Sequence, residues 1–127
     1  MRRIYNVDSG VQNGTDIRFL LKESPDHSVK AGCQIITDTE NLAFIYLLDD
    51  TDGYTYVQFP KTVWPLLAVA LEADKEPMLV WGEDVITLDN FREELRMLIF
   101  NIEGNLNYGE EFSTAVEDAF KEQLSLN

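Results

Sequence analysis

Residues 47–59, LLDDTDGYTYVQF, place three aspartates and a glycine between two apolar runs. Carboxylates at such spacing could bind calcium as in an EF-hand loop, which needs oxygen ligands at its first, third and fifth positions and a glutamate at its twelfth. With Gly53 at the sixth position, which is a glycine in that loop, Leu48 falls at the first and Phe59 at the twelfth. An Asp-Gly pair between apolar runs is instead typical of a β-hairpin. We therefore predict a hairpin turn over residues 49–53 and no metal site.

The register of this hairpin decides which side chains share a face. A turn from Asp49 to Gly53 would put Tyr46, Tyr54 and Tyr56 on one face of the two strands. Their predicted neighbours on that face are Phe44 and Leu48, and the other face would carry Ile45, Leu47, Val57 and Phe59. Both faces are apolar, which predicts a central hairpin covered on both sides. The alternative is that Tyr46, Tyr54 and Tyr56 line a surface that binds a small ligand.

A cysteine beside a histidine could act as a nucleophile and its base. Cys33 and His27 are the only residues of their types, and one cysteine excludes an internal disulfide and any multi-cysteine metal site. Cys33 opens an apolar run and His27 lies in a polar segment. We therefore predict a buried, inert thiol and a solvated imidazole, with no catalytic residue and no cofactor.

The first half of the chain carries the pattern of β-strands. Short runs rich in β-branched and aromatic residues cover residues 3–7, 17–22, 33–37, 43–48 and 54–59. Polar, glycine-containing segments such as DSGVQNG separate them and predict turns. An antiparallel sheet is the simplest arrangement of these strands, and a further small hairpin is predicted over residues 77–88.

The second half carries the pattern of three helices. The first, over residues 63–73, is apolar almost all round, so we expect it to be buried. The second, over residues 90–103, has Phe91, Leu95, Leu98 and Ile102 at spacings of three and four, and the third begins near Asn107. The predicted fold class is α+β, with a mostly antiparallel N-terminal sheet and about three helices, two of them C-terminal. We expect residues 1–127 to form a single domain.

The second predicted helix carries a further apolar patch. At about 100 degrees per residue, Phe100 lies nearly opposite the core-facing stripe and is flanked by Arg96 and Met97. Aromatic, Met and Arg side chains are enriched where proteins meet. We predict that Arg96, Met97 and Phe100 bind a protein partner or a second copy of the chain. The alternative is that the last helix covers Met97 and Phe100 within the same chain.

The charge of the chain limits the class of its partners. The formal net charge is −13, most of it in the second half. Nucleic acid and anionic lipid bind clustered Lys and Arg, so we expect neither as a direct partner, and any charged partner should be basic. The N-terminus MRRIYNVDSG becomes polar before a signal-peptide core could form, and no apolar run reaches the length that a bilayer requires. These features predict a cytoplasmic protein.

Three segments resemble the YjbL-like family of small uncharacterised proteins from Bacillus and its relatives. They are YTYVQFPKTVWP, VWPLLAVALE and LDNFREELRMLIFNIEGNLNYGEEF, with the strongest likeness over residues 101–111. The resemblance covers roughly residues 43–119 and leaves the N-terminal forty residues unplaced. It implies a cytoplasmic bacterial protein and supplies no catalytic residue.

The sequence therefore favours a non-enzymatic module for protein interaction or regulation, with a homodimer as one form that it could take. One alternative is a small-ligand-binding protein or an enzyme that uses the tyrosine-lined face. Another is an acidic mimic of nucleic acid, whose carboxylates would occupy a basic groove of a partner.

Overall fold

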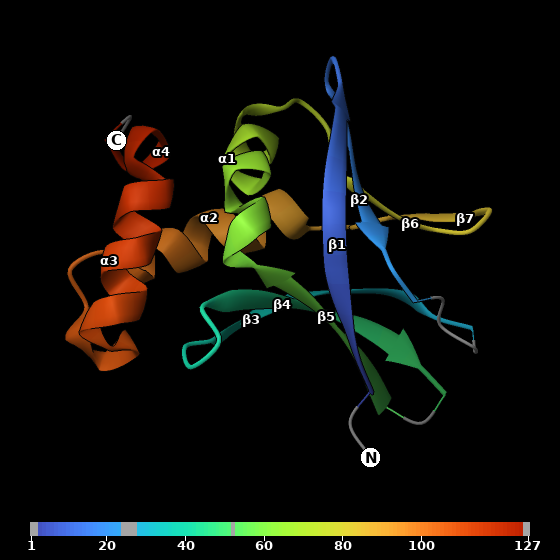
Figure 1. The fold of residues 1–127 in the computed structure, drawn as a ribbon, viewed down its shortest axis with the longest axis horizontal. Helices are drawn as coiled ribbons and strands as arrows, with labels where there is room; N and C mark the ends of the chain where they lie inside the picture. The colour runs from blue at the N-terminus through green and yellow to red at the C-terminus, as the bar shows by residue number, and fades with distance from the viewer. Residues whose placement is uncertain (1–2, 24–27, 52, 126–127) are drawn as a thin grey trace.

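A computed structural model describes residues 3–23, 28–51 and 53–125 of the chain (Figure 1). The strands are β1 Arg3–Asn13, β2 Asp16–Leu21, β3 Lys30–Asp38, β4 Ala43–Asp50, β5 Gly53–Pro60, β6 Met78–Trp81 and β7 Asp84–Thr87. The helices are α1 Trp64–Glu72, α2 Phe91–Ile102, α3 Glu110–Ala119 and α4 Lys121–Ser125. Two 3-10 turns, η1 Lys61–Val63 and η2 Leu106–Tyr108, precede α1 and α3.

The strands form one seven-stranded sheet in the order β3-β4-β5-β1-β2-β6-β7. The α+β class is confirmed, but the sheet is mixed rather than mostly antiparallel, because β1 runs parallel to β5 and β2 runs parallel to β6. Both parallel pairs join strands that are far apart in the sequence, so the alternation within each strand carried no signal of them. The sheet also includes the later hairpin β6–β7 and is therefore not confined to the N-terminal half.

Strand β1 continues through the segment DSGVQN, for which the sequence predicted a turn. The pairing of β1 with β2 shifts between Val7 and Ser9, which marks a β-bulge at Asp8. A bulge bends a strand, and here β1 pairs with β5 before the bend and with β2 around and beyond it. Gly10 lies where an added Cβ atom would be 2.2 Å from Leu66 Cδ2. This glycine therefore reflects the close approach of α1 and not a turn.

The β4–β5 hairpin confirms the predicted turn but not its register. Asp49 pairs with Tyr54 and Asp50 with Gly53, so the turn is tighter than predicted; Asp52 lies outside the described residues. A shift of one residue moves side chains to the opposite face of a strand. Consequently Tyr46 points into the core, whereas Tyr54 and Tyr56 lie on the other face of the sheet.

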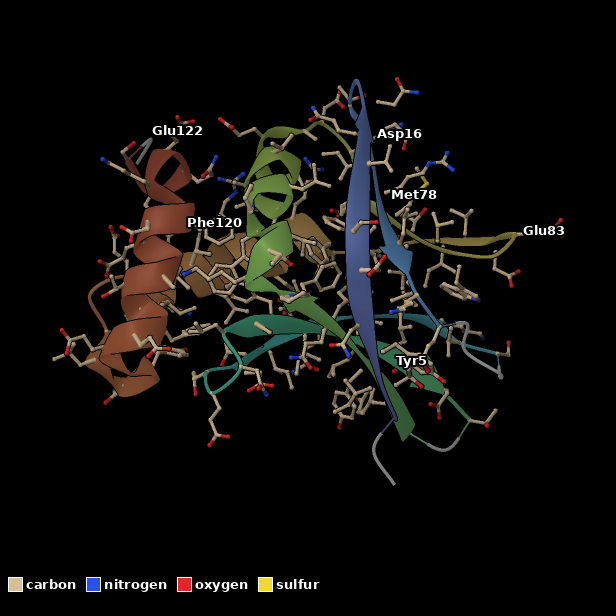
Figure 2. All side chains as sticks on the ribbon, in the orientation of Figure 1. Tyr5, Asp16, Met78, Glu83, Phe120 and Glu122 are labelled. Carbon is tan, nitrogen blue, oxygen red and sulfur yellow. The ribbon has the colours of Figure 1, made fainter. Side chains whose placement is uncertain are left out.

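The helices gather on one side of the sheet, and the β6–β7 hairpin, with Glu83 at its tip, projects away from them (Figures 1 and 2). Trp64 of α1 joins the layers: its ring lies 5.0 Å from that of Phe44, 5.9 Å from Phe112 and 6.0 Å from Phe120. All four aromatic side chains are buried. At the other end of the core, Phe91 packs against Phe19, Phe59 and Tyr46.

Three of the four helices lie close to their predicted positions. In α2 the buried side chains are Phe91, Leu95, Ile99 and Ile102, so Ile99 replaces the predicted Leu98 in the stripe. The third helix begins at Glu110, after η2, and the short α4 follows it without having been predicted. No helix in the described part of the chain is long and apolar enough to cross a membrane.

Candidate functional site

A groove of about 490 Å³ lies between the second half of β1 and helix α1. Its first wall is formed by residues of β1, namely Asp8, Ser9, Gly10 and Gln12. Its second wall is formed by residues of η1 and α1, namely Thr62, Val63, Pro65, Leu66 and Val69. The volume falls in the range of sites that bind ligands or short peptide segments. We call this feature the β1–α1 groove.

The wall formed by β1 is a free strand edge. Only residues 3–6 of β1 pair with β5, because β1 then bends at the bulge at Asp8. β5 stays paired with β4 up to Pro60 and leads through η1 into α1 (Figure 1). From Ser9 to Asn13, β1 pairs with β2 on one side, and no described strand pairs with it on the side of the groove. The exposed backbone groups of such an edge can form hydrogen bonds with a further strand.

The wall formed by α1 is apolar. The sequence WPLLAVALE places apolar residues all round the helix, and the core takes Trp64, Leu67 and Leu71. On the opposite side Pro65 is exposed, and Leu66 and Val69 are half-buried. The expectation that the whole helix is buried therefore holds only in part, because the sheet and the other helices leave this side of α1 partly open. The uncovered apolar residues face the free edge of β1.

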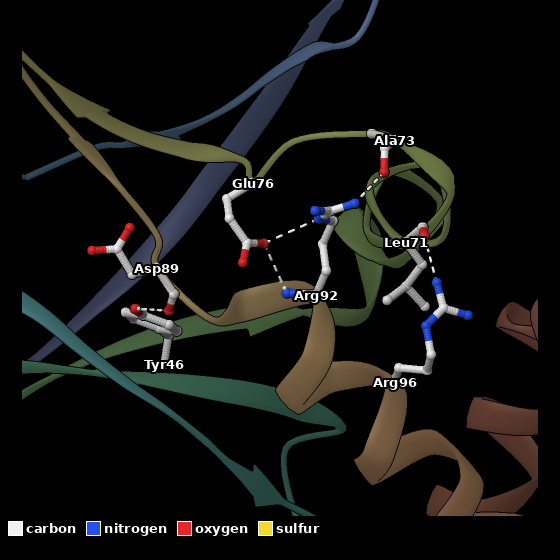
Figure 3. A network of polar contacts seen from close by, with 7 residues as sticks. All are labelled: Tyr46, Leu71, Ala73, Glu76, Asp89, Arg92 and Arg96. Carbon is white, nitrogen blue, oxygen red and sulfur yellow. Dashed lines mark hydrogen bonds and ion pairs between the residues drawn. The ribbon is translucent and has the colours of Figure 1, made fainter.

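A network of polar contacts fixes the C-terminal end of α1 (Figure 3). Arg92 of α2 donates to the carbonyl oxygen of Ala73 through Nη1 and to Glu76 Oε1 through Nε, the latter at 3.2 Å. Arg96 donates from Nη2 to the carbonyl oxygen of Leu71 at 2.6 Å. Cationic side chains at the last carbonyls of a helix stabilise it. The α1 wall of the groove is therefore held in place by α2.

The far edge of the sheet, in contrast, is covered by side chains. Glu94 of α2 accepts a hydrogen bond from the backbone N–H of Ile35 at 3.4 Å, and Asn90 donates to the carbonyl oxygen of Cys33 at 3.3 Å. The hydroxyl of Tyr46 accepts from the N–H of Cys33. It donates to the carbonyl oxygen of Asp89, a contact that Figure 3 shows. The donors and acceptors of this polar cluster form hydrogen bonds with one another, so the cluster has a structural role.

Tyr46, Tyr54 and Tyr56, which the sequence offered as a ligand surface, do not share a face. Tyr46 is fully buried, and burial raises the pKa of its hydroxyl above the ordinary value, with the charges of Asp89 and Glu76 adding to the effect. Tyr54 is half exposed and Tyr56 partly buried on the opposite face, beside Leu47. The register shift thus separates Tyr46 from the other two tyrosines, and ligand binding by these residues stays a prediction.

Cys33 differs from its prediction. Its side chain is exposed, and its backbone φ of 62° lies in the left-handed region. The residue sits where the pairing of β3 with β4 shifts between Ala31 and Gln34, so the bulge turns the thiol outward. His27, the proposed partner in a nucleophile–base pair, lies outside the described residues.

The patch predicted on α2 is only partly open. Arg96 is engaged with α1, Phe100 is half-buried against the core, and Met97 is 50% exposed. Of the alternative, in which the last helix covers Met97 and Phe100, the structure supports partial burial of Phe100 but not of Met97. Partner binding by Arg96, Met97 and Phe100 stays a prediction.

Single substitutions of Met97 and Phe100 should show which of these two side chains of α2 packs on the core. Met97→Ser should change the free energy of unfolding by less than about 0.5 kcal/mol, the usual range for a surface position. Phe100→Ser should lower it by about 1 kcal/mol or more, because it removes apolar surface packed on the core. Urea denaturation of both variants measures the difference. Equal, small effects would place Phe100 on an open surface instead.

A larger hollow of about 670 Å³ lies beside the start of α3. Three carboxylates, Glu110, Glu111 and Asp118, and the ammonium of Lys61 dominate its lining. Charged side chains on an exposed helix are well solvated without a ligand. The β1–α1 groove is the stronger candidate, because it combines an apolar wall with unpaired backbone.

Sequence reasoning missed the groove residues Ser9, Gly10, Gln12, Leu66 and Val69. Glycine and polar residues in DSGVQN suggested a turn, which hid the strand. The sequence did contain one signal of the α1 wall. A helix that is apolar all round needs more cover than one sheet face provides.

Comparisons with known proteins place the chain among uncharacterised bacterial proteins. The sequence model of UPF0738, described as a family of unknown function, matches residues 5–120. The chain is 40% identical over 126 residues to a UPF0738 protein of Lysinibacillus sphaericus, covering 98% of this chain and 99% of that one. It is 44% identical over 89 residues to one of Geobacillus kaustophilus, covering 70% and 71% of the two chains. It is 35% identical over 102 residues to one of Staphylococcus haemolyticus, covering 80% and 84%.

No solved structure matches the chain. The family match begins at residue 5 and so includes the N-terminal strands, which the resemblance had left unplaced. Uncharacterised proteins of Bacillus relatives were the predicted class, and the matches confirm that class, while the name YjbL-like stays a prediction.

Proposed function

The chain belongs to the UPF0738 family of unknown function, and from this premise we propose that it is a non-enzymatic protein-interaction module. Its contact surface is the β1–α1 groove. We further propose that it acts in the cytoplasm, where its net charge of −13 favours basic partners.

One observation carries this proposal. The unpaired edge of β1 runs beside the uncovered apolar residues of α1 in one groove. A bound polypeptide can pair with the unpaired backbone groups through main-chain hydrogen bonds. Its side chains can at the same time cover the apolar wall. A partner protein accounts for both features.

The groove lining favours binding over catalysis. Among the described residues that line the groove, Asp8 is the only one with a titratable side chain, and none supplies an imidazole or amine to the hydroxyls of Ser9 and Thr62. An acid–base pair or an activated nucleophile requires such a second group. The chemistry of the groove therefore suits recognition.

Site-specific crosslinking tests the proposal. A photoreactive benzoylphenylalanine in place of Val69 should form a discrete protein adduct in a lysate of Lysinibacillus sphaericus. Excess unlabelled wild-type chain should suppress the adduct, whereas excess Val69→Lys chain should not, because lysine removes apolar surface and repels a basic partner. The matched control carries the photoreactive residue in place of Met97 on α2.

The proposal fails if the Val69 position yields no adduct that the wild-type chain suppresses. It also fails if only the Met97 position crosslinks, since that result would move the contact surface to α2.

A further inference from the structure

We infer, resting on the proposed function, that the partner binds by adding a strand to the free edge of β1. The occupant is an extended, basic peptide segment of another protein. Its backbone pairs with residues 9–13 of β1, and the side chains on its inner face contact α1.

The hairpin geometry identifies the backbone groups that are available. Only two residues, Gly14 and Thr15, connect Asn13 to its partner Asp16, so Asn13 and Asp16 are the pair whose backbone groups face each other. In antiparallel strands such pairs alternate with pairs whose N–H and C=O groups point outward. Counting back from Asn13, the outward residues of β1 are Gln12 and Gly10. Both line the groove.

The other sheet edges are protected and this one is not. Edge strands are commonly blunted by charge, proline, shortness or a cover. The side chains of Glu94 in α2 and of Asn90 just before it bond to β3, while β7 has four residues and begins with Asp84. The β1 segment Ser9–Asn13, SGVQN, contains neither charge nor proline. An open, uncharged edge of five residues is suited to pairing with another strand.

Charge selects a basic segment over a second copy of the chain. Two chains of −13 repel each other, whereas a basic segment is attracted. Asp8 is the charged side chain of the groove lining and lies at one end of the free edge. We therefore place a Lys or Arg of the partner beside Asp8.

The α1 wall specifies the remaining side chains. Leu66 lies over Gly10 and fills the space above it, so the inner side chains of the added strand lie beside Leu66 in the groove. Leu66 and Val69 then offer apolar contact on that face. The expected pattern is an alternation of apolar residues toward α1 and polar or basic residues toward solvent.

Proline substitution on the free edge tests this inference. The probe is a set of octapeptides selected from a random display library on the immobilised wild-type chain, with binding measured by calorimetry. Gln12→Pro removes an outward N–H without touching the pairing with β2, as proline is tolerated on an edge. It should weaken binding by about tenfold or more, the loss expected for one or two backbone hydrogen bonds. The matched control Gln12→Ala loses the same side chain but keeps the N–H, so the difference in affinity between the two variants measures the backbone hydrogen bond.

N-methylation of the selected peptide gives a second test of strand addition, which does not depend on the folding of a protein variant. Only every second N–H of an added strand faces β1. Methylation of these N–H groups should therefore abolish binding, and methylation of the intervening N–H groups should be tolerated. Uniform tolerance would overturn strand addition.

The outcomes separate the inference from the proposed function. If Val69→Lys weakens binding and Gln12→Pro does not, the groove binds a partner but not as a strand, and only the inference falls. If neither substitution matters, or no peptide is selected, both fall. If the free wild-type chain sediments as a dimer that Gln12→Pro dissociates, a second copy is the occupant and the basic partner is wrong.

Discussion

Replacing Trp64 by alanine should lower the free energy of unfolding by about 3–5 kcal/mol, the range for large aromatic truncations in a core. The indole is fully buried against Phe44, Phe112 and Phe120, so its removal leaves a cavity between the sheet, α1 and α3. Its Nε1–H also donates to the carbonyl oxygen of Phe59 at 3.1 Å, a hydrogen bond that the variant loses. Urea denaturation followed by circular dichroism measures the loss.

Trp64→Phe is the matched control for this prediction. It keeps an aromatic ring in the cluster and removes mainly the hydrogen bond and part of the volume, so it should cost less than the alanine variant. A loss below about 1 kcal/mol for Trp64→Ala would contradict the placement of α1 on the sheet. It would also remove the wall on which the β1–α1 groove depends.

Tyr46→Phe should lower the free energy of unfolding by about 1–3 kcal/mol near neutral pH. The phenol oxygen bridges two backbone groups, accepting from the N–H of Cys33 at 3.2 Å and donating to the carbonyl oxygen of Asp89 at 2.6 Å. Phenylalanine fills the same space but leaves both groups without this partner. Thermal or urea unfolding of the two proteins under the same buffer gives the difference.

The same residue gives a pH dependence of known sign. Burial raises the pKa of the Tyr46 hydroxyl in the folded chain above the value of 10.0 for an exposed tyrosine. The folded state therefore holds this proton at alkaline pH where the unfolded state has lost it, and stability falls as pH rises above about 10. The wild-type chain should lose more stability than Tyr46→Phe between pH 10 and higher values. Parallel curves for the two proteins would show that Tyr46 is not buried.

Local patterns predicted most of the elements of this fold. The hairpin from β4 to β5, the β6–β7 hairpin and the helices α1 to α3 follow from alternation, turn residues and helical spacing. What these patterns lack is information on pairing between distant strands. Contacts across the whole sheet determine the parallel pairs β1–β5 and β2–β6. They also determine the register of β5 against β4, which differs by one residue from the predicted one.

The candidate site was hidden for related reasons. A bulge at Asp8 and a glycine at position 10 break the alternation of β1, and both follow from how this strand bends past α1. The left-handed conformation of Cys33 similarly turned a predicted buried thiol outward. In each case tertiary packing set the local conformation, so the residue types alone pointed to a turn or to burial.

Amide hydrogen exchange of β1, measured residue by residue by NMR, tests strand addition most directly. In the free chain the amides of Ser9 and Val11 should exchange slowly, because they face β2, and those of Gly10 and Gln12 should exchange fast. Saturation with the selected basic octapeptide should slow Gly10 and Gln12 and leave Ser9 and Val11 unchanged. Fast exchange at Gly10 and Gln12 in the saturated complex would contradict the account.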